Sequence, residues 1–283
     1  MSASSGSVSM RDALFEAPGP KTKRKILIGT IISSIAIAAI LVWVVLRLYQ
    51  MGQFDASYWY FFGQWSTWRF LLQGLAGTAE VAVTAGVIAL ALGILFMFGR
   101  ISKNRVVSGI FRVIINFFRG IPSLLLIYFF FLVIPSYGIK MPAFWMLTLP
   151  ISLTASGVLA EVFRAGVNAV PNGQREAALS LGMTEGKVLR KIILPQAIRY
   201  VIPSLISQLV VVVKDTSVAY VVSFPDLLQN ARVLISNYDS LVSVYFVVAI
   251  IYILINYAIN ELAVRMARQS GTKVVTRAQE NPV

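Results

Sequence analysis

The segment that decides how this chain is organised is Glu176–Pro195, EAALSLGMTEGKVLRKIILP, a charged stretch between two long apolar ones. It is too long for a minimal turn and too polar to lie in hydrocarbon. Its GMTEGK run, residues 182–187, looks like a phosphate-binding loop at first sight. However, three residues separate its two glycines where that motif has four, and Val188 follows Lys187 where Ser or Thr is required. The segment therefore does not predict nucleotide binding.

The same segment predicts two short helices joined at a glycine. Asn172 is a suitable N-cap for the first helix, and Gly182 stands where a left-handed residue would end it. Thr184 can cap the second helix, and Pro195 ends it. The apolar face of the second helix has four members: Val188, Leu189, Ile192 and Ile193. Two small residues leave the surface of the first helix bare: Ala177 and Ala178. Such a hairpin suits docking against another protein, and a simple linker is the alternative.

The rest of the chain is dominated by apolar stretches. Its 283 residues are 57% hydrophobic and 13% charged, and the mean hydropathy of +0.75 is that of a membrane protein. A helix needs about 20 apolar residues to cross a bilayer. Six stretches are long enough: 26–48, 70–98, 110–134, 143–164, 197–222 and 241–264. We therefore expect an all-α polytopic membrane protein with six transmembrane helices. The first stretch is longer than the roughly 7–15 apolar residues of a signal peptide, so we interpret it as a retained anchor.

The net charge of +13 reflects topology, and it does not indicate nucleic-acid binding. With a cytoplasmic N-terminus, five basic residues lie in the N-terminal tail, five follow the second stretch, six surround the quoted segment and four lie at the C-terminus. These are 20 of the 25 Lys and Arg residues; Arg47, Arg69, Lys140 and Arg232 fall on the other side, and Lys214 lies within a stretch. The positive-inside rule therefore predicts that both termini and the quoted segment are cytoplasmic.

The chain has no Cys and no His. That excludes disulfides, thiolate chemistry, haem ligation, and imidazole-based zinc sites or catalytic triads. An enzyme embedded in the membrane would have only carboxylates, hydroxyls and lysines, and no recognisable constellation of these is present. We expect no cofactor and no metal bound by this chain.

The charged residues within the apolar stretches include Glu80, Glu161, Lys214 and Asp215. A charge at the bilayer centre costs roughly 2.5–3.5 kcal/mol on insertion scales, so each should face protein or a watery cavity. Glu80 is near the outer end of its stretch, and we interpret it as reaching the interface. Glu161 shares one helical face with Thr154 and Gly157. It is either a residue of a substrate pathway or the partner of Arg164 in a structural ion pair.

Lys214 and Asp215 are adjacent, so their side chains point in different directions around a helix and need not pair. Asp215, Thr216 and Ser217 suit the cap of a helix that restarts within the membrane, an arrangement that transporters use to hold anionic groups. A zwitterionic amino acid needs a carboxylate for its ammonium group and N–H groups or a cation for its own carboxylate. Lys214, Asp215 and Arg119 could supply these groups, and packing between helices is the alternative role.

Several motifs resemble the permease subunits of ABC importers. The run Glu176-Ala177-Ala178, with Gly182 six residues after the glutamate, Ile192 ten after that glycine and then Leu194-Pro195, looks like the EAA loop of that family. In the family this loop forms coupling helices that sit in a groove of the ATPase subunit. Further motifs between about residues 70 and 265 resemble the polar amino-acid branch: Gly74-Leu75 with Thr78, Arg119-Gly120-Ile121-Pro122, Glu161-Val162-Phe163-Arg164-Ala165-Gly166 and Lys214-Asp215-Thr216-Ser217. Many relatives have Thr where Ile121 stands.

The resemblance implies a type-1 ABC importer permease with a five-helix core, one additional N-terminal helix and a cytoplasmic coupling hairpin. The expected parts are a disordered basic cytoplasmic tail (1–25), the additional transmembrane helix (26–48), an aromatic interfacial segment (49–69), the transmembrane core (70–265, with the coupling loop at 166–196) and a cytoplasmic tail (266–283). The aromatic segment, which contains YWYFF at 58–62, is interpreted as an interfacial belt, with a docking surface for an extracellular partner as the alternative.

As a function, the resemblance implies ATP-driven import of a polar amino acid, of the glutamate type, across the bacterial plasma (inner) membrane. The implied coupling residues are Glu176, Ala177, Ala178, Gly182, Ile192, Leu194 and Pro195, and the candidates for the substrate pathway are Arg119, Glu161, Lys214, Asp215, Thr216 and Ser217. The implied partners are two ATPase subunits, which hydrolyse the ATP, a second permease subunit, homologous or identical, and an extracytoplasmic substrate-binding protein. The chain is also expected to contact the amino-acid substrate and the lipid bilayer, and it is not expected to bind nucleic acid. The alternative is a secondary transporter or channel driven by ion gradients.

Overall fold

The structure is a computed structural model that describes residues 19–269. Among these residues the chain is almost entirely helical and contains no β-strand, as its apolar patterning predicts. The chain divides into two units, Met1–Tyr58 and Trp59–Val283. Of the disordered tail predicted for residues 1–25, residues 1–18 lie outside the described residues, whereas residues 20–25 are helical and the prediction is wrong there. Of the tail predicted for 266–283, residues 270–283 lie outside the described residues.

The first unit is built on one long helix, α2, which spans Pro20–Gln50. It begins six residues before the predicted stretch, because Pro20 is tolerated in a first turn and the lysines and arginine that follow are good helix formers. Its apolar window has a mean hydropathy of 2.5, which suits a membrane span. A short 3₁₀ helix, η1 at Ala56–Tyr58, ends this unit.

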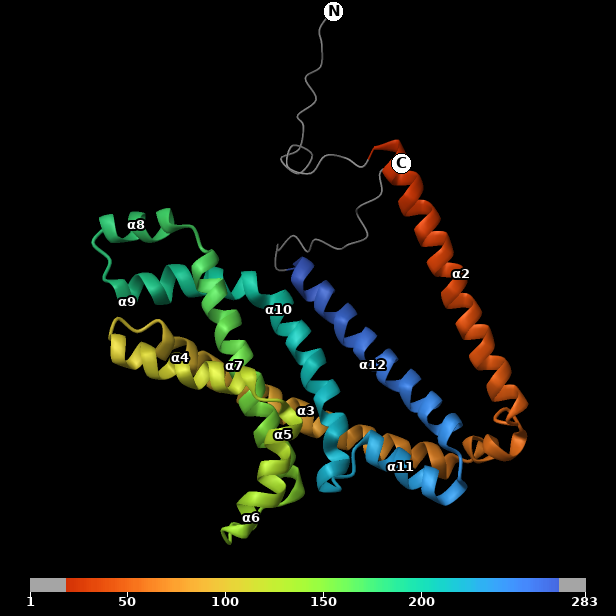
Figure 1. The fold of residues 1–283 in the computed structure, drawn as a ribbon. Coiled ribbons are helices and arrows are strands. Elements are labelled where there is room, and N and C mark those ends of the chain that lie inside the picture. The colour runs from red at the N-terminus through yellow and green to blue at the C-terminus, as the bar shows by residue number, and fades with distance from the viewer. Residues whose placement is uncertain (1–18, 270–283) are drawn as a thin grey trace, which may run out of the picture. The chain divides into compact units, whose positions relative to one another are not determined.

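The second unit contains the remaining helices, most of them labelled in Figure 1. In chain order they are η2 (Tyr60–Gly63), α3 (Trp65–Arg100), α4 (Arg105–Gly120), α5 (Ser123–Tyr128), the π-helical turn η3 (Phe129–Val133), α6 (Ile134–Ser136), α7 (Ala143–Ala169), α8 (Asn172–Ser180), α9 (Glu185–Val188), the π-helical turn η4 (Leu189–Ile193), α10 (Leu194–Asp215), the 3₁₀ helix η5 (Thr216–Val222), α11 (Leu227–Tyr238) and α12 (Leu241–Gln269).

Among the described residues, five helical segments are long and apolar enough to cross a membrane, and there are six if the bent pair α4 and α5–α6 counts as one span. The bend is 96°, at Ile121 and Pro122. Pro122 has no N–H to continue the helix, and it favours the extended backbone that Ile121 adopts, with ψ 129°. The third predicted stretch, 110–134, is therefore not one straight helix.

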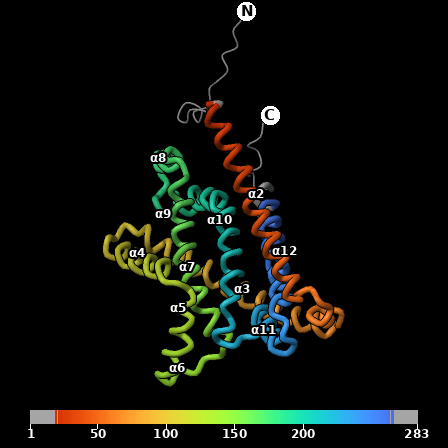
Figure 2. The backbone as a smooth tube through the Cα atoms, turned by 45° about the vertical axis from the view of Figure 1, so that its right-hand side comes forward, coloured from red at the N-terminus to blue at the C-terminus, as the bar shows by residue number. Residues whose placement is uncertain are grey.

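Helix α7 is central to the second unit and packs against α3, α10 and α4 (Figure 2). The largest apolar cluster joins α3, α5, α7 and α10; its buried members include Val81, Ala85, Ile127, Leu147, Ile151 and Val213. Alanines at positions 82, 85 and 89 give α3 a smooth face, which allows helix backbones to approach closely in a membrane.

A second apolar cluster joins η2, α3, α11 and α12. Within it Phe61 is fully buried and stacks on Tyr238, with ring centroids 4.3 Å apart. Part of the predicted aromatic belt is therefore packed inside protein, whereas Tyr60 and Trp65 are exposed. Whether the exposed rings lie at the membrane interface or against a partner stays a prediction.

Candidate functional site

The segment Glu176–Pro195 folds as a helical hairpin that turns at Gly182. This glycine has φ +79°, and its N–H donates to the carbonyl of Leu179 over 2.9 Å. The N–H of Met183 donates to the carbonyl of Ala178 over 3.2 Å, so the carbonyls at the end of α8 are satisfied. A Cβ at position 182 would meet nothing within 4 Å. The left-handed glycine is therefore confirmed, and the backbone conformation alone requires it.

Three details of the predicted hairpin are wrong. Asn172 is not an N-cap, because Pro171 holds that position and Asn172 is the first helical residue. Thr184 is the N-cap of α9, but its side chain makes no capping hydrogen bond. Pro195 does not end the second helix, since helical structure continues from Glu185 to Val222. The π-helical turn η4 precedes this proline and accommodates its missing N–H.

The hairpin has its own small core. Ala178 is only 6% exposed and belongs to one apolar cluster with residues of α9, η4 and α10: Val188, Ile193 and Ala197. The expectation that Ala178 leaves a bare surface is therefore wrong, because the alanine faces the second helix. Its neighbour Ala177 is exposed. Of the remaining predicted coupling residues, Ile192 is half-buried against this core and Leu194 is half-buried against the largest apolar cluster. Glu176 and Pro195 are exposed.

The turn of the hairpin exposes an apolar side chain. Leu181, directly before Gly182, is 84% exposed, and Leu179 is 37% exposed. We call Ala177, Leu179, Leu181 and Gly182 the hairpin tip. An exposed leucine next to a turn with a left-handed glycine is an apolar feature in a segment that is otherwise largely polar.

One ion pair connects the hairpin to the turn between α3 and α4, and a second joins the two helices of the hairpin. Glu185 Oε1 lies 3.5 Å from Lys103 Nζ, and its Oε2 lies 2.5 Å from Arg175 Nη2. A cavity of about 660 Å³ lies between these parts and is also lined by Asn168 near the end of α7. The Lys103 side chain is 79% exposed, so these ion pairs contribute orientation and little stability.

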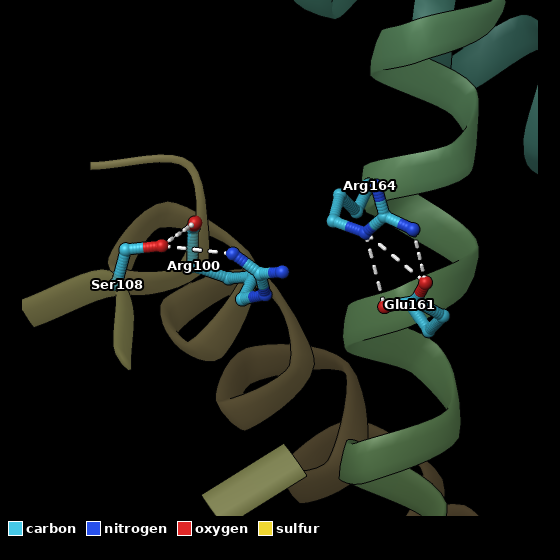
Figure 3. A network of polar contacts seen from close by, with 4 residues as sticks. All are labelled: Arg100, Ser108, Glu161 and Arg164. Carbon is cyan, nitrogen blue, oxygen red and sulfur yellow. Dashed lines mark hydrogen bonds and ion pairs between the residues drawn. The ribbon is translucent and has the colours of Figure 1, made fainter. Parts of the chain in front are cut away.

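Glu161 lies within α7 and pairs with Arg164 one turn later (Figure 3). Arg164 Nε donates to both carboxylate oxygens, over 3.0 and 3.1 Å, and Nη2 donates to Oε1. Arg100 and Arg119 also lie close enough to act electrostatically on this carboxylate. In Figure 3, Arg100 is itself held by Ser108, whose hydroxyl accepts from Nη1 over 2.8 Å. The structural ion pair predicted for Glu161 is confirmed.

The other residues of that helical face are packed. Thr154 is buried, and its hydroxyl lies 3.1 Å from the carbonyls of both Pro150 and Ile151. Gly157 is also buried, against the backbone of α4. The face that Glu161 shares is therefore buried at Thr154 and packs against α4 at Gly157. Arg119, in the last turn of α4, is exposed.

Lys214 and Asp215 lie where α10 passes into η5, and they differ in environment. Lys214 is exposed, whereas Asp215 is half-buried and within reach of the Ser123 hydroxyl. Thr216 is buried and donates to the carbonyl of Val213 over 2.8 Å; Ser217 is half-buried. The expected cap at Asp215 is wrong: its backbone stays helical, with φ −67° and ψ −23°, and the side chain caps nothing. The helix tightens here and does not restart.

The cap occurs eleven residues later, at Asp226, which the sequence interpretation missed. This buried carboxylate accepts from the N–H of Gln229 over 2.7 Å and lies 3.4 Å from the Tyr252 hydroxyl of α12. Burial raises the pKa of the Asp226 carboxyl to about 6. An Asp directly before an apolar run is a standard N-cap signal, so the sequence contained it.

Two long-range hydrogen bonds hold α11 against α3. The N–H of Leu227 donates to the Thr78 hydroxyl over 3.1 Å, and Asn230 Nδ2 donates to the carbonyl of Phe70 over 2.7 Å. Glu80, on the same helix α3, is exposed and lines a depression of about 430 Å³ with Gln73 and Phe224. It lies fifteen residues after the helix begins, and its predicted place at the interface stays a prediction.

Packed apolar spans, a broken helix and an exposed helical hairpin define a polytopic membrane protein. Residues 89–269 match the model of the family described as "Binding-protein-dependent transport system inner membrane component". The chain belongs to this family. It is a multi-pass membrane protein, and the predicted resemblance to amino-acid ABC permeases is confirmed by the relatives that follow.

Among curated proteins, the chain is 34% identical over 240 residues to the glutamate transport system permease protein GluD of Corynebacterium glutamicum, covering 82% of this chain and 88% of that protein. It is 32% identical to the probable glutamine ABC transporter permease protein GlnP of Bacillus subtilis, covering 70% and 92%. Among solved structures, one of an amino acid ABC transporter with histidines has a TM-score of 0.70 at 27% identity and covers 74% of this chain and 98% of that one. The MetNI methionine ABC transporter shares the fold, with a TM-score of 0.60 at 19% identity, over 73% and 99%. The chain is thus an ABC importer permease for amino acids.

Proposed function

We propose that this chain is the translocation subunit of an ATP-driven importer that carries a polar amino acid of the glutamate type into the cytoplasm. The relative of 34% identity is named as a glutamate permease, which supports the substrate class. The observation that carries the mechanism is the hairpin tip, an apolar surface on a turn fixed by Gly182. ATP is hydrolysed by partner subunits, and this chain is not an enzyme.

The hairpin tip docks on an ATPase subunit in this proposal. Ala177 is small and exposed, so a partner can approach the α8 backbone, and Leu181 fills an apolar depression of the partner. Glu176, Ile192, Leu194 and Pro195 keep the hairpin in shape around this contact. Two ATPase subunits require two hairpins, so the chain pairs with a second permease subunit, homologous or identical. The importer also needs an extracytoplasmic substrate-binding protein, and no cofactor is bound by this chain.

The substrate pathway is proposed to follow one face of α10. Exposed residues recur there at spacings of three and four: Ser204, Ser207, Val211 and Lys214. A cation at the end of an exposed face suits the carboxylate of an amino acid, and Asp215 one residue on suits its ammonium group. Arg119 and Ser217 remain candidates for the substrate pathway. Glu161 and Thr216 are weaker candidates, because the first is paired with Arg164 and the second is buried.

The proposed orientation places both termini and the hairpin in the cytoplasm. Single cysteines report it cleanly, since the chain has none of its own. Gly173→Cys in α8 is expected to react only with a reagent supplied from the cytoplasmic side, and Asn237→Cys in α11 only with one supplied from outside. Both positions are exposed. Reaction of Gly173→Cys from outside would reverse the orientation.

The coupling proposal is tested by Ala177→Trp, with Ser180→Ala as the matched control on the same helix. The indole fills space that the ATPase needs, so the variant should insert normally and yet copurify poorly with the ATPase. The control removes only the hydrogen bond from the Ser180 hydroxyl to the Glu176 carbonyl, 3.0 Å long, and should behave as the native chain. Normal ATPase association of Ala177→Trp would reduce the hairpin to a linker.

A further inference from the structure

A polar depression lies at the end of the chain's spans that is remote from the hairpin. It has a volume of about 370 Å³ and is formed by η5 and α11; its polar lining residues are Tyr220, Ser223, Gln229, Arg232, Ser236 and Asn237. Helix α10 connects the hairpin to η5, so the two features lie at opposite ends of a span, as Figures 1 and 2 show for α8 and α11. Nothing in the proposed pathway uses this depression.

Arg232 is the charged centre of the depression. Its guanidinium lies over the ring of Tyr220, 4.7 Å from the centroid, and this cation–π contact fixes its position. Among the residues that the structure describes, it forms no ion pair with a carboxylate, and no acidic residue lines the depression. The guanidinium therefore has its N–H groups available for an anion.

The surrounding residues complete a set of donors on a rigid support. Gln229, Arg232, Ser236 and Asn237 share one face of α11, at spacings of three, four and one, while the opposite face is buried against α3 and α12. The helix is held by the Asp226 cap and by the bond from Asn230 to Phe70. The Ser236 hydroxyl donates to the Arg232 carbonyl over 3.1 Å, so the available donors are the side-chain amides and the guanidinium. Amide and guanidinium donors that line one depression match a carboxylate.

The shape of the depression decides between a free small molecule and a side chain presented by a protein. Every polar lining residue except Gln229 is exposed, so the depression is shallow. A small ligand is normally held in a pocket that buries most of its surface, which this depression cannot do. A carboxylate carried on the surface of a docking protein needs no such burial, because the rest of the interface surrounds it.

We propose that Arg232 and its neighbours on α11 receive an Asp or Glu side chain of the extracytoplasmic substrate-binding protein. This inference rests on the proposed function, which places α11 on the extracytoplasmic side and requires such a protein. The inference adds a specific contact to the proposed function: one ion pair with the polar face of α11 orients the binding protein over the end of α10. Charge pairs at the edge of an interface act mainly on encounter and orientation, so the contact sets how much binding protein is needed and leaves the maximal rate unchanged.

The test uses the assembled permease–ATPase complex in nanodiscs and measures ATP hydrolysis against the concentration of the purified, substrate-loaded binding protein. Arg232→Gln is expected to raise the half-stimulating concentration about tenfold, with the basal and the maximal rates unchanged. Arg232→Lys should give a smaller increase, because it keeps the charge and loses the fork of donors. The difference between native and Arg232→Gln should shrink as salt rises from about 50 to about 300 mM, because screening weakens the pair.

Arg69→Gln is the matched control. Arg69 is also exposed and lies in the first turn of α3, the helix that α11 packs against, but outside the depression. Its half-stimulating concentration should be that of the native chain. Arg232→Glu can also be combined with Asp→Arg or Glu→Arg variants of the binding protein, one acidic position at a time. Stimulation should be restored by the variant at the position that pairs with residue 232.

The outcomes separate this inference from the proposed function. If the native complex is stimulated and Arg232→Gln has the same half-stimulating concentration, the docking contact is overturned and the importer stands. If the native complex is not stimulated by any binding protein, both are overturned. A photo-crosslinker attached at Ser236→Cys adds a direct readout. An adduct with the binding protein supports the contact, and an adduct with a second permease chain, or with lipid alone, overturns it.

Discussion

The hairpin tip and α11 are both short helical features outside the spans, at opposite ends of the chain's membrane-crossing helices, and they are stabilised in opposite ways. The hairpin packs mostly on itself, through a small core of residues from Val170 to Ala197. Helix α11 depends on residues that are 149 and 160 positions away, Thr78 and Phe70. One feature can therefore change without disturbing the fold, and the other cannot. This difference suits a hairpin that moves with a partner and a helix that forms part of a fixed wall.

The largest expected effect is on the α11 side. Gly74 lies in α3 where α11 approaches most closely, and a Cβ there would lie 2.7 Å from the carbonyl oxygen of Asp226 and 2.8 Å from Asn230 Nδ2. Gly74→Val should therefore separate α11 from α3 and lower the stability of the purified chain by about 1–3 kcal/mol or more. Thermal unfolding in detergent measures this loss of stability. The control is Gly109→Val in α4, where a Cβ meets nothing within 4 Å. Equal stability of the two variants would show that α11 is not fixed by this contact.

On the hairpin side, Gly182→Val should act on coupling and leave the membrane fold intact. A β-branched residue at φ +79° is strained by about 1–2 kcal/mol, and the strain is confined to the turn. ATPase association and uptake should fall, while insertion and thermal unfolding of the spans stay normal. Gly186→Val, at a glycine with neither a positive φ nor a close neighbour, is the control. Normal coupling in Gly182→Val would argue that the fixed turn is unnecessary.

The buried Asp226 gives the α11 side a pH dependence. Its folded pKa of about 6 is above that of an unfolded Asp, about 3.9. The stability that its neutral form contributes is complete below about pH 4 and is lost as the pH rises through about 6. Asp226→Asn keeps the cap acceptor and removes the titration. At pH 7.5 the free energy of unfolding of Asp226→Asn should equal that of the native chain or exceed it by about 1–2 kcal/mol. The two chains should converge near pH 4; a variant that is less stable at pH 7.5 would contradict the buried-charge account.

The smallest effect is expected at Glu185. Exposed ion pairs are weak, so Lys103→Glu should change ATPase stimulation by only about twofold, through a less well oriented hairpin. The exchange Lys103→Glu with Glu185→Lys should return stimulation to the native level. If the single variant abolished stimulation, the turn between α3 and α4 would be part of the docking surface itself.

The sequence predicted what depends on neighbours in the chain and missed what depends on distant ones. Gly182 was predictable because a glycine between two short helical patterns has a local reason to be left-handed. The burial of Ala178 was not, since Ala177 and Ala178 differ only in which one faces the second helix of the hairpin. Pro195 misled for a different reason: a π-helical turn directly before it, which the sequence pattern did not predict, allows the helix to continue.

Among the charged residues predicted within the membrane, the local ion pair was predicted correctly and the capping position was not. The Glu161–Arg164 pair is a contact between residues one helical turn apart, and spacing alone indicated it. The capping position near the end of α10 was assigned to Asp215 because two hydroxyl residues follow it. The backbone there stays helical, and the extended conformation that a cap requires occurs at Asp226, where α3 and α12 supply the surroundings.

The most direct test of the central claim measures labelled glutamate uptake and ATP hydrolysis together, in proteoliposomes that contain the native chain or Gly182→Val with its ATPase, under added binding protein. The account predicts that uptake by the native complex requires ATP, persists when ionophores collapse the ion gradients, and falls together with ATPase stimulation in Gly182→Val. Uptake that continues without ATP, stops with ionophores and is unaffected by Gly182→Val would contradict it and assign the chain to gradient-driven transport.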